Sequence, residues 1–164
     1  MQTQTIVKRA AQGFILLSAL ALLSVSAMAF ANPQSVMDLV HVQLTNTDAF
    51  SSIRGVYGGV GATIVISLLY LMVTDVNKGL AFLGLLWGFY ALSRTITVFA
   101  EGALGDFGRQ WLVTESVFFV IALVLLRANS RTTAVSVSTL TFLRARQLLE
   151  TSIEVLDLPP IVIG

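Results

Sequence analysis

The sequence has no cysteine and only one histidine, and its net charge of +1 is close to zero. Without cysteine the chain has no disulfide, no thiolate metal ligand and no thiol nucleophile. His41 alone cannot supply the several imidazole ligands of a histidine metal site. A near-neutral chain also has no electrostatic basis for nucleic-acid binding. The sequence therefore predicts no metal, no cofactor and no nucleic-acid partner.

Charged residues are scarce as well, at 12% of the chain, whereas apolar residues make up 55%. Soluble domains carry about 25% charged residues. A soluble fold of 164 residues with this composition would expose too much apolar surface to water. We therefore expect lipid to cover most of the surface, which makes the bilayer the first partner of this protein.

Four long apolar stretches follow one another along the chain. A helix needs about 20 mostly apolar residues to cross roughly 30 Å of hydrocarbon. The stretches that approach this length are residues 12–31, 55–74, 79–99 and 108–126. The sequence thus predicts an all-α fold, with a four-helix transmembrane bundle over residues 1–127 and a tail over 128–164.

The first stretch also has features of a secretory signal. Lys8 and Arg9 form a basic start, and Ala29, Phe30 and Ala31 fit a small-x-small cleavage site. The apolar run is long for a signal core, so we expect a retained helix, with a cleaved signal as the alternative.

Lysine and arginine are distributed unequally between the two sides of the membrane. Seven lie in the segments of one side and two in those of the other. The seven are Lys8, Arg9, Lys78, Arg127, Arg131, Arg144 and Arg146, and the two are Arg54 and Arg109. Since the side richer in these residues is cytoplasmic, the count predicts a bacterial inner-membrane protein with both termini in the cytoplasm.

The connections and the tail carry weaker patterns. After Pro33, the apolar spacing over 35–42 predicts a short interfacial helix in the first outer loop. The short connection 75–78 predicts that the second and third spans pack antiparallel. Residues 130–141 are rich in Ser, Thr and Val, and within them 135–138 alternate as a strand or extended linker does. Residues 142–156 suggest an amphipathic helix. Such a helix docks on the membrane or a partner, or the segment is disordered.

Two charged residues within the apolar spans stand out. A charge at the bilayer centre costs at least ~2.5–3.5 kcal/mol on insertion scales, so such residues usually pair or face a cavity. Arg94 lies five residues before Phe99, near the outer end of the third span, and Glu115 lies four residues after Trp111. At 1.5 Å per residue both lie roughly 6–8 Å below the outer boundary. We therefore expect Arg94 and Glu115 to pair.

Four other polar residues are predicted to lie near this pair: Arg54, Tyr57, Glu101 and Asp106. One interpretation is a polar pocket, open to the periplasm, that binds a lipid headgroup, a small anion or a partner segment. The alternative is structural: the pair fixes the helix register, and Arg54 extends to the headgroups.

Small residues recur four positions apart on two spans, which lets helices approach closely. These residues are Gly55, Gly58, Gly59, Ala62, Gly84 and Gly88. We expect them to pack within the bundle, with dimerisation as the alternative. The glycine run lacks the Lys-Ser/Thr ending of a phosphate-binding loop, so that function is rejected.

The segment Arg54-Gly55-Val56-Tyr57-Gly58-Gly59 opens the second span, and an arginine late in the third and a carboxylate early in the fourth follow it. In these features the chain resembles a family of small four-span bacterial membrane proteins described only as a domain of unknown function. The resemblance covers about residues 12–127. It implies a four-helix membrane bundle with Arg54, Tyr57, Arg94 and Glu115 as shared polar positions, and it implies no activity, cofactor or partner.

These observations favour a non-enzymatic membrane protein, either an accessory or scaffolding subunit of a larger complex or a binder of lipid or a small ligand. The alternative is a small transporter or channel-like oligomer formed by self-association. Such proteins usually have polar residues at mid-membrane, whereas here they cluster near one face. An intramembrane enzyme has only Tyr57 and Glu115 as candidate catalytic groups.

Overall fold

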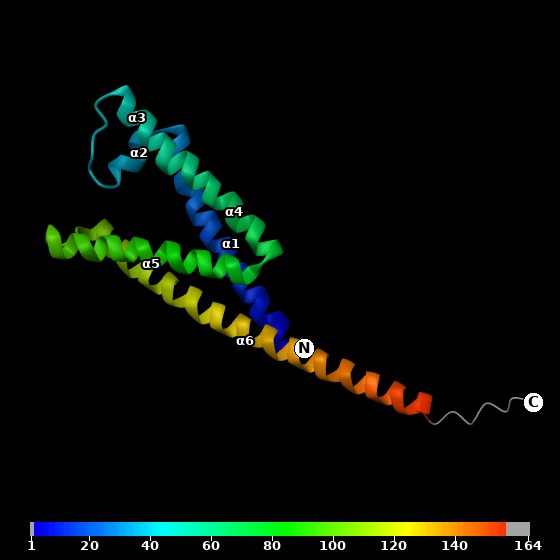
Figure 1. Ribbon diagram of the computed structural model, residues 1–164. Helices are drawn as coiled ribbons and strands as arrows, with labels where there is room; N and C mark the ends of the chain where they lie inside the picture. The colour runs from blue at the N-terminus through cyan, green and yellow to red at the C-terminus, as the bar shows by residue number, and fades with distance from the viewer. Residues whose placement is uncertain (1, 157–164) are drawn as a thin grey trace, which may run out of the picture. The chain divides into compact units, whose positions relative to one another are not determined.

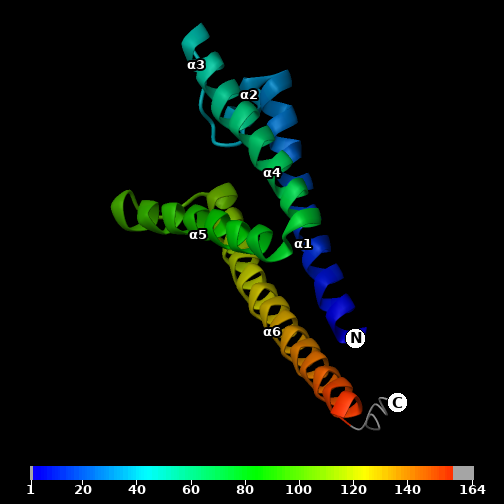
Figure 2. The same cartoon turned by 45° about the vertical axis from the view of Figure 1, so that its right-hand side comes forward.

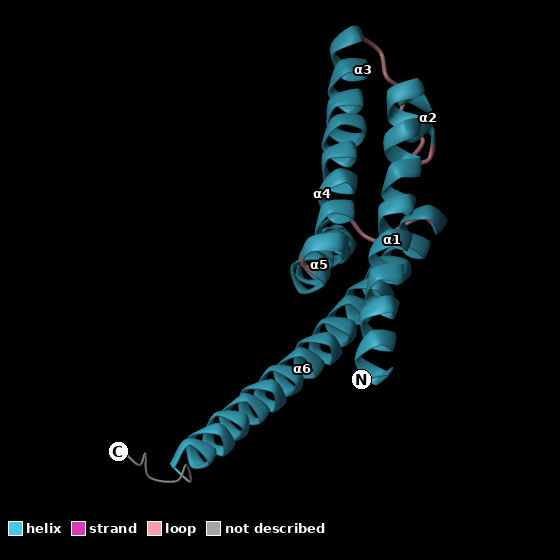
Figure 3. Ribbon diagram, turned by 90° about the vertical axis from the view of Figure 1, so that its right-hand side faces the viewer, coloured by secondary structure: helices cyan, strands magenta, loops and turns pink. Residues whose placement is uncertain are grey.

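The computed structural model describes residues 2–156, and every regular element in that range is helical (Figures 1 and 3). The elements are α1 (Gln2–Ala31), α2 (Pro33–Asp38), α3 (Thr47–Ile53), the π-helical segment η1 (Arg54–Val60), α4 (Gly61–Thr74), α5 (Val76–Ala100) and α6 (Asp106–Leu156). The predicted all-α fold is confirmed. The chain divides into two units, Met1–Asn129 and Ser130–Gly164.

Within residues 2–156, four helical stretches are long and apolar enough to cross a membrane. They are Thr5–Ala31, Thr47–Thr74, Val76–Ala100 and Asp106–Arg131. Each contains one of the stretches predicted from sequence and extends beyond it. The chain is therefore a multi-pass membrane protein.

Polar residues set where the helices begin. The side chain of Asn32 accepts a hydrogen bond from the Gln34 N–H at the start of α2. Pro33, at the first position of this helix, has no N–H group that would need an acceptor. Asn46 caps α3 in the same way, and Asp75 caps α5 while ending α4. Because Asp75 alone joins α4 to α5, the chain reverses direction within one residue.

The loop between α1 and α3 contains a short helix, as its sequence pattern suggested, but α2 ends at Asp38. His41 then adopts a left-handed conformation with φ of 57°, which turns the chain. The Gln34 side chain stabilises this turn, since its Nε2 donates to Asp38 Oδ1 at 2.6 Å and to the Val42 carbonyl at 2.9 Å. The interfacial position of α2 stays a prediction.

Within the first unit the long helices pack as two antiparallel pairs (Figures 1 and 2). In the first pair, α1 lies along α4: Ser26 Oγ donates to the Gly58 carbonyl at 2.7 Å, and Gln12 Nε2 donates to the Met72 carbonyl at 3.1 Å. In the second pair, α5 lies along α6, with Asn129 Nδ2 donating to Asn77 Oδ1 at 2.8 Å.

The packing predicted between the second and third spans is thereby corrected. Gly79 of α5 lies against Leu71 of α4 beside the turn. Beyond the turn, α4 and α5 separate in both Figure 1 and Figure 2. The one-residue connection reverses the chain, but α4 packs mainly on α1 and α5 on α6.

The main core lies near this turn and draws on α1, α4, α5 and α6. We call it the turn-end core, and its buried members are Ala11, Phe14, Ile15, Ala19, Val65, Leu68, Val76, Leu80, Leu83, Trp87 and Ala122. Glycine permits close approach here, because a Cβ at Gly79 would lie 2.9 Å from Ile15 Cδ1. All four long helices thus contribute to one bundle.

The second unit is helical as far as Leu156. The extended linker predicted over 130–141 is therefore wrong. No glycine or proline occurs between Gly108 and Pro159, and β-branched residues each cost a helix only a few tenths of a kcal/mol up to about 0.7. The helix predicted over 142–156 is part of α6, with Phe142, Leu148 and Leu149 exposed. Pro159 and Pro160 lie outside the described residues.

Candidate functional site

An ion pair joins α5 to α6 where the sequence predicted it. Arg94 Nε donates to Glu115 Oε2 at 2.8 Å. Glu115 is only 2% exposed, and Arg94 is half-buried. The antiparallel arrangement of the two helices brings these side chains to the same level, so the predicted pairing is confirmed.

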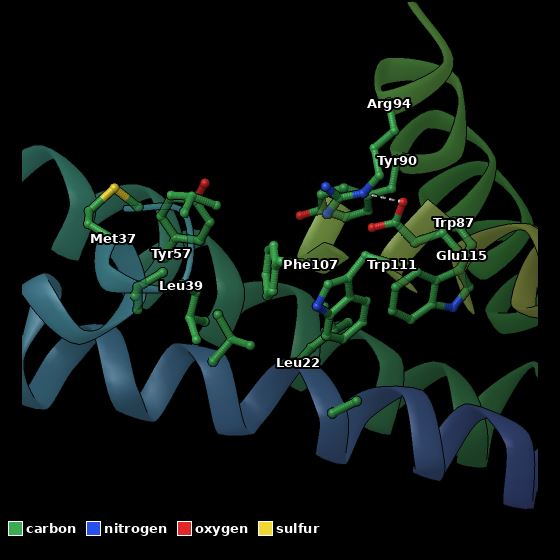
Figure 4. A pocket seen from close by; sticks show the side chains of 14 residues that line it. Leu22, Met37, Leu39, Tyr57, Trp87, Tyr90, Arg94, Phe107, Trp111 and Glu115 are labelled. Atoms are coloured by element: carbon green, nitrogen blue, oxygen red, sulfur yellow. Dashed lines mark hydrogen bonds and ion pairs between the residues drawn. The ribbon is translucent and has the colours of Figure 1, made fainter. Parts of the chain in front are cut away.

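The pair forms part of the wall of a cavity of about 240 Å³ (Figure 4). We call this cavity the pocket. Its walls come from α1, from α2 and the turn after it, from η1, and from α5 and α6. The lining residues are Ala21, Leu22, Val25, Val36, Met37, Leu39, Val40, Tyr57, Trp87, Tyr90, Arg94, Phe107, Trp111 and Glu115. The pocket thus lies between the α1–α4 pair and the α5–α6 pair.

Aromatic side chains surround the ion pair. The rings of Trp87 and Tyr90 are 6.1 Å apart between centroids, and those of Phe107 and Trp111 are 6.2 Å apart. The Arg94 guanidinium lies 6.0 Å from the centre of the Phe107 ring, at the outer limit of a cation–π contact. The charged groups therefore have polarisable apolar neighbours.

Tyr57 forms another wall of the pocket, and Figure 4 shows it on the far side from Arg94 and Glu115. It belongs to η1, a full π-helical segment. Such segments are rare and frequently lie at functional sites. Tyr57 is 38% exposed, and its phenol adds a hydroxyl to an otherwise apolar side of the pocket.

Three of the six predicted cluster residues do not line the pocket. Arg54 Nε donates to the Phe30 carbonyl at 3.2 Å. Asp106 pairs with Arg109 at 2.8 Å on the exposed first turn of α6. Glu101 is the exposed C-cap of α5. The predicted six-residue cluster is therefore reduced to Tyr57, Arg94 and Glu115 at the pocket.

Two of these departures, those of Asp106 and Arg54, have local causes. Asp106 finds a partner three residues later in its own helix, which is a neighbouring position on an α-helix. Arg54 finds a carbonyl at the end of α1, where the last carbonyls of a helix lack partners within the helix. Both interactions are local to the surface, so neither side chain needs to reach the buried pair.

The sequence reasoning missed the aromatic lining. The cluster predicted from sequence consists of Tyr57 and charged residues, and it does not include Trp87, Tyr90 or Trp111. A signal was present, because Phe107, Trp111 and Glu115 are spaced by four and therefore share one helix face. Trp87 and Tyr90 lie seven and four residues before Arg94 and share its face in the same way.

Among the predicted packing glycines, three have close neighbours. A Cβ on Gly58 would lie 3.1 Å from the Phe30 ring, and one on Gly88 would lie 3.0 Å from the Phe119 ring. A Cβ on Gly84 would lie 3.6 Å from Leu123 Cδ2. Gly58 therefore allows α1 to approach η1 closely, and the other two do the same for α5 and α6.

Gly55 and Gly59 differ, since a Cβ on either would meet nothing within 4 Å. Within the described residues they pack against no other helix, so the expected packing is wrong for these two. Both glycines therefore lie on a part of η1 that faces open space, whereas Gly58 faces α1. Ala62, on α4, is half-buried. At Gly61, which the prediction omitted, a Cβ would lie 3.1 Å from Ser26 Cβ.

The comparisons with known proteins identify the family. Residues 10–126 match the family model described as "Domain of unknown function (DUF4345)". The chain belongs to this family. The family resemblance inferred from sequence is thereby confirmed, and no curated protein and no solved structure matches the chain.

The DUF4345 domain contains every residue that lines the pocket. It ends at Leu126, so it leaves out the second unit. Over the described residues no three His, Cys, Asp or Glu side chains form a group suited to a metal ion. What the pocket offers chemically is a buried guanidinium–carboxylate pair, a phenol and apolar walls.

Proposed function

We propose that this DUF4345 protein is a non-enzymatic protein of a bacterial inner membrane that binds one end of a lipid or a similar amphiphile in the pocket. The observation that carries the proposal is the composition of the pocket wall. Twelve of its fourteen lining residues are uncharged, and the remaining two form the Arg94–Glu115 pair. Such a wall suits a molecule with a polar head and an apolar body.

The size of the pocket supports an amphiphile that remains partly in the bilayer. Pockets that enclose a drug-sized ligand usually measure about 300–1,000 Å³, whereas this one measures about 240 Å³. It therefore suits the head end of a lipid. Leu39 and Val40 at the rim are 41% and 46% exposed, so apolar surface continues outward from the pocket.

The charge asymmetry of the loops supports an orientation with both termini in the cytoplasm. In that orientation α2 and the loop between α5 and α6 face the periplasm, and the pocket opens into the outer leaflet. The turn-end core then occupies the cytoplasmic half of the bundle. Its packed apolar side chains argue against a continuous path for ions or solutes, and hence against the transporter or channel alternative.

A second candidate is an accessory or scaffolding role through self-association or within a larger membrane complex. The observation that favours it is the open space at Gly55 and Gly59, beside the exposed Val56 and Val60. Small residues on a membrane-facing helix surface permit close helix association. Replacing Gly59 with leucine is expected to abolish any co-purifying partner or dimer in mild detergent while leaving bound lipid unchanged.

Lipid binding can be tested with the full-length protein purified in mild detergent. Native mass spectrometry is expected to show the chain with one retained lipid. Leu22→Trp, which fills the pocket, is expected to remove that lipid. Leu23→Trp is the matched control, because Leu23 is 44% exposed and does not line the pocket. Equal lipid retention by both variants would contradict the proposal.

A further inference from the structure

Resting on the proposed function, we infer that the pocket selects a zwitterionic phospholipid head, with a phosphate and an ammonium group, over an anionic one. The feature that points to this class is the opposite charge of the two partners in the ion pair, buried Glu115 and half-buried Arg94. Arg94 and Glu115 are the charged residues of the lining, and they are 2.8 Å apart. A ligand that complements both must itself carry one charge of each sign.

A singly charged head suits this pair less well. An anionic head gains from Arg94 but meets the Glu115 carboxylate, which is almost completely buried. A cationic head gains from Glu115 but is repelled by the guanidinium charge of Arg94. Like charges placed together away from water cost several kcal/mol in an interface, so the pair disfavours both kinds of singly charged head.

The hydrogen-bonding groups of the pair agree with this choice. A guanidinium has five N–H donors, and Nε–H is the one that Arg94 gives to Glu115. Its terminal nitrogens have the geometry that binds a phosphate with two parallel bonds. Glu115 uses Oε2 for Arg94, and a carboxylate has a second oxygen that accepts from an ammonium N–H.

The aromatic lining adds to the ammonium site. Ammonium groups are attracted to the faces of tryptophan, tyrosine and phenylalanine rings within about 6 Å. Trp87, Tyr90 and Trp111 line the same pocket as Glu115, and Figure 4 shows these three side chains on the same side of the pocket as the pair. The wall that holds the carboxylate is therefore also suited to a cation.

The test is a competition between phosphatidylethanolamine and phosphatidylglycerol with identical acyl chains. The full-length protein is equilibrated with equal amounts of both lipids, and native mass spectrometry gives the ratio of the two bound species. We expect phosphatidylethanolamine to exceed phosphatidylglycerol by about tenfold, the ratio that one charge interaction of moderate strength produces. Equal occupancy, or an excess of phosphatidylglycerol, would overturn the inference.

Glu115→Gln tests the origin of the preference. Glutamine keeps the shape and an acceptor for Arg94 but leaves the guanidinium charge uncompensated, so the ratio is expected to move toward phosphatidylglycerol. Asp106→Asn is the matched control, since it removes a carboxylate from the same helix outside the pocket, and it is expected to leave the ratio unchanged. An unchanged ratio in Glu115→Gln would contradict the inference.

The outcomes separate this inference from the proposed function. If the wild-type protein retains neither lipid, and pocket filling changes nothing, the proposed function fails. If lipid is retained and lost in Leu22→Trp, but without preference between the two heads, the proposed function holds and the head-group inference fails. The ratio of the two lipids bound to the wild-type protein tests the head-group inference by itself, even if Glu115→Gln does not fold.

Discussion

The two halves of the bundle are built by the same helices and packed in different ways. At the turn-end core, Ile15, Leu68, Leu80 and Leu83 are completely or almost completely buried. At the other half, the pocket separates the two helix pairs, and Tyr57 and Tyr90 are about 40% exposed. One half encloses apolar side chains, whereas the other leaves room beside a buried charge pair.

The residues at the points of contact explain the difference. Alanine and glycine alternate with leucine near the turn, so α1 and α5 approach until a Cβ at Gly79 would touch Ile15. Around the pocket the wall combines aliphatic residues of α1 and α2 with five aromatic residues and the Arg94–Glu115 pair. Small residues thus bring the helices together near the turn, whereas the wall of the pocket consists mostly of larger side chains and a charge pair.

The strongest way to disturb the pocket half is to break the ion pair. Arg94→Ala leaves Glu115 buried without its partner, and losing one partner of a buried pair typically costs about 3–5 kcal/mol. The double variant Arg94→Ala/Glu115→Ala removes both charges, so its loss is expected to be smaller than that of either single variant. Reversible unfolding by titration with a denaturing detergent measures the free energies of unfolding. Losses that add in the double variant would show that the two residues do not interact.

A core substitution compares the two halves directly. Leu80→Ala empties space in the turn-end core, where Leu80 is 0% exposed, and such changes cost about 2–5 kcal/mol. Leu39→Ala at the rim of the pocket is expected to change the unfolding free energy by less than about 0.5 kcal/mol, as exposed positions usually do. The same denaturation assay provides both values. Equal losses would mean that the two halves are packed alike.

The glycines give a smaller and more local comparison. Gly88→Leu forces the Phe119 ring to move, and overpacking of this kind costs about 1–3 kcal/mol. Gly59→Leu enters open space and gains helix propensity, so it is expected to be neutral or slightly stabilising. Thermal melting of each variant in detergent, followed by circular dichroism, tests the difference. A loss of stability of the same size in Gly59→Leu would indicate that another helix packs against η1.

The smallest effect concerns the turn between α4 and α5. The backbone N–H of Lys78, and then its side chain, lower the pKa of Asp75 below the ordinary value of 3.8. Because the folded pKa is lowered, this stabilisation is present above the unfolded pKa and is lost as the pH falls through the folded one. Asp75→Asn keeps a capping side chain without the charge. We expect the melting temperature of the wild type to exceed that of Asp75→Asn at about pH 6, and the difference between the two melting temperatures to be smaller at about pH 3. A gap that does not change with pH would exclude a contribution from the charge.

Much of the fold was predictable, because its determinants are local in sequence. Apolar length gave the spans, and Asp75 could be recognised as a turn. Arg94 and Glu115 could be paired, since a short loop between two antiparallel helices fixes their relative depth. These predictions used only helix rise and the high cost of an unpaired charge in lipid.

What could not be predicted depends on side-chain direction and on competition between partners. Arg54 binds the carbonyl of Phe30, and Asp106 binds Arg109, which spacing alone does not reveal. Gly58 packs against Phe30 of α1, whereas Gly55 and Gly59 face open space, and sequence spacing does not distinguish them. The alternation at 135–138 resembles that of a strand, but no glycine or proline there ends α6.

The central claim is that a lipid head occupies the pocket between the two helix pairs. Photo-crosslinking with a phospholipid that carries a diazirine next to its phosphate tests this most directly. After digestion, the account predicts labelled peptides concentrated on the pocket lining, including Trp111 and Leu22, and depleted in the Leu22→Trp variant. Labelling that is spread evenly over exposed positions such as Ile66 and Phe99, and unaffected by Leu22→Trp, would contradict it.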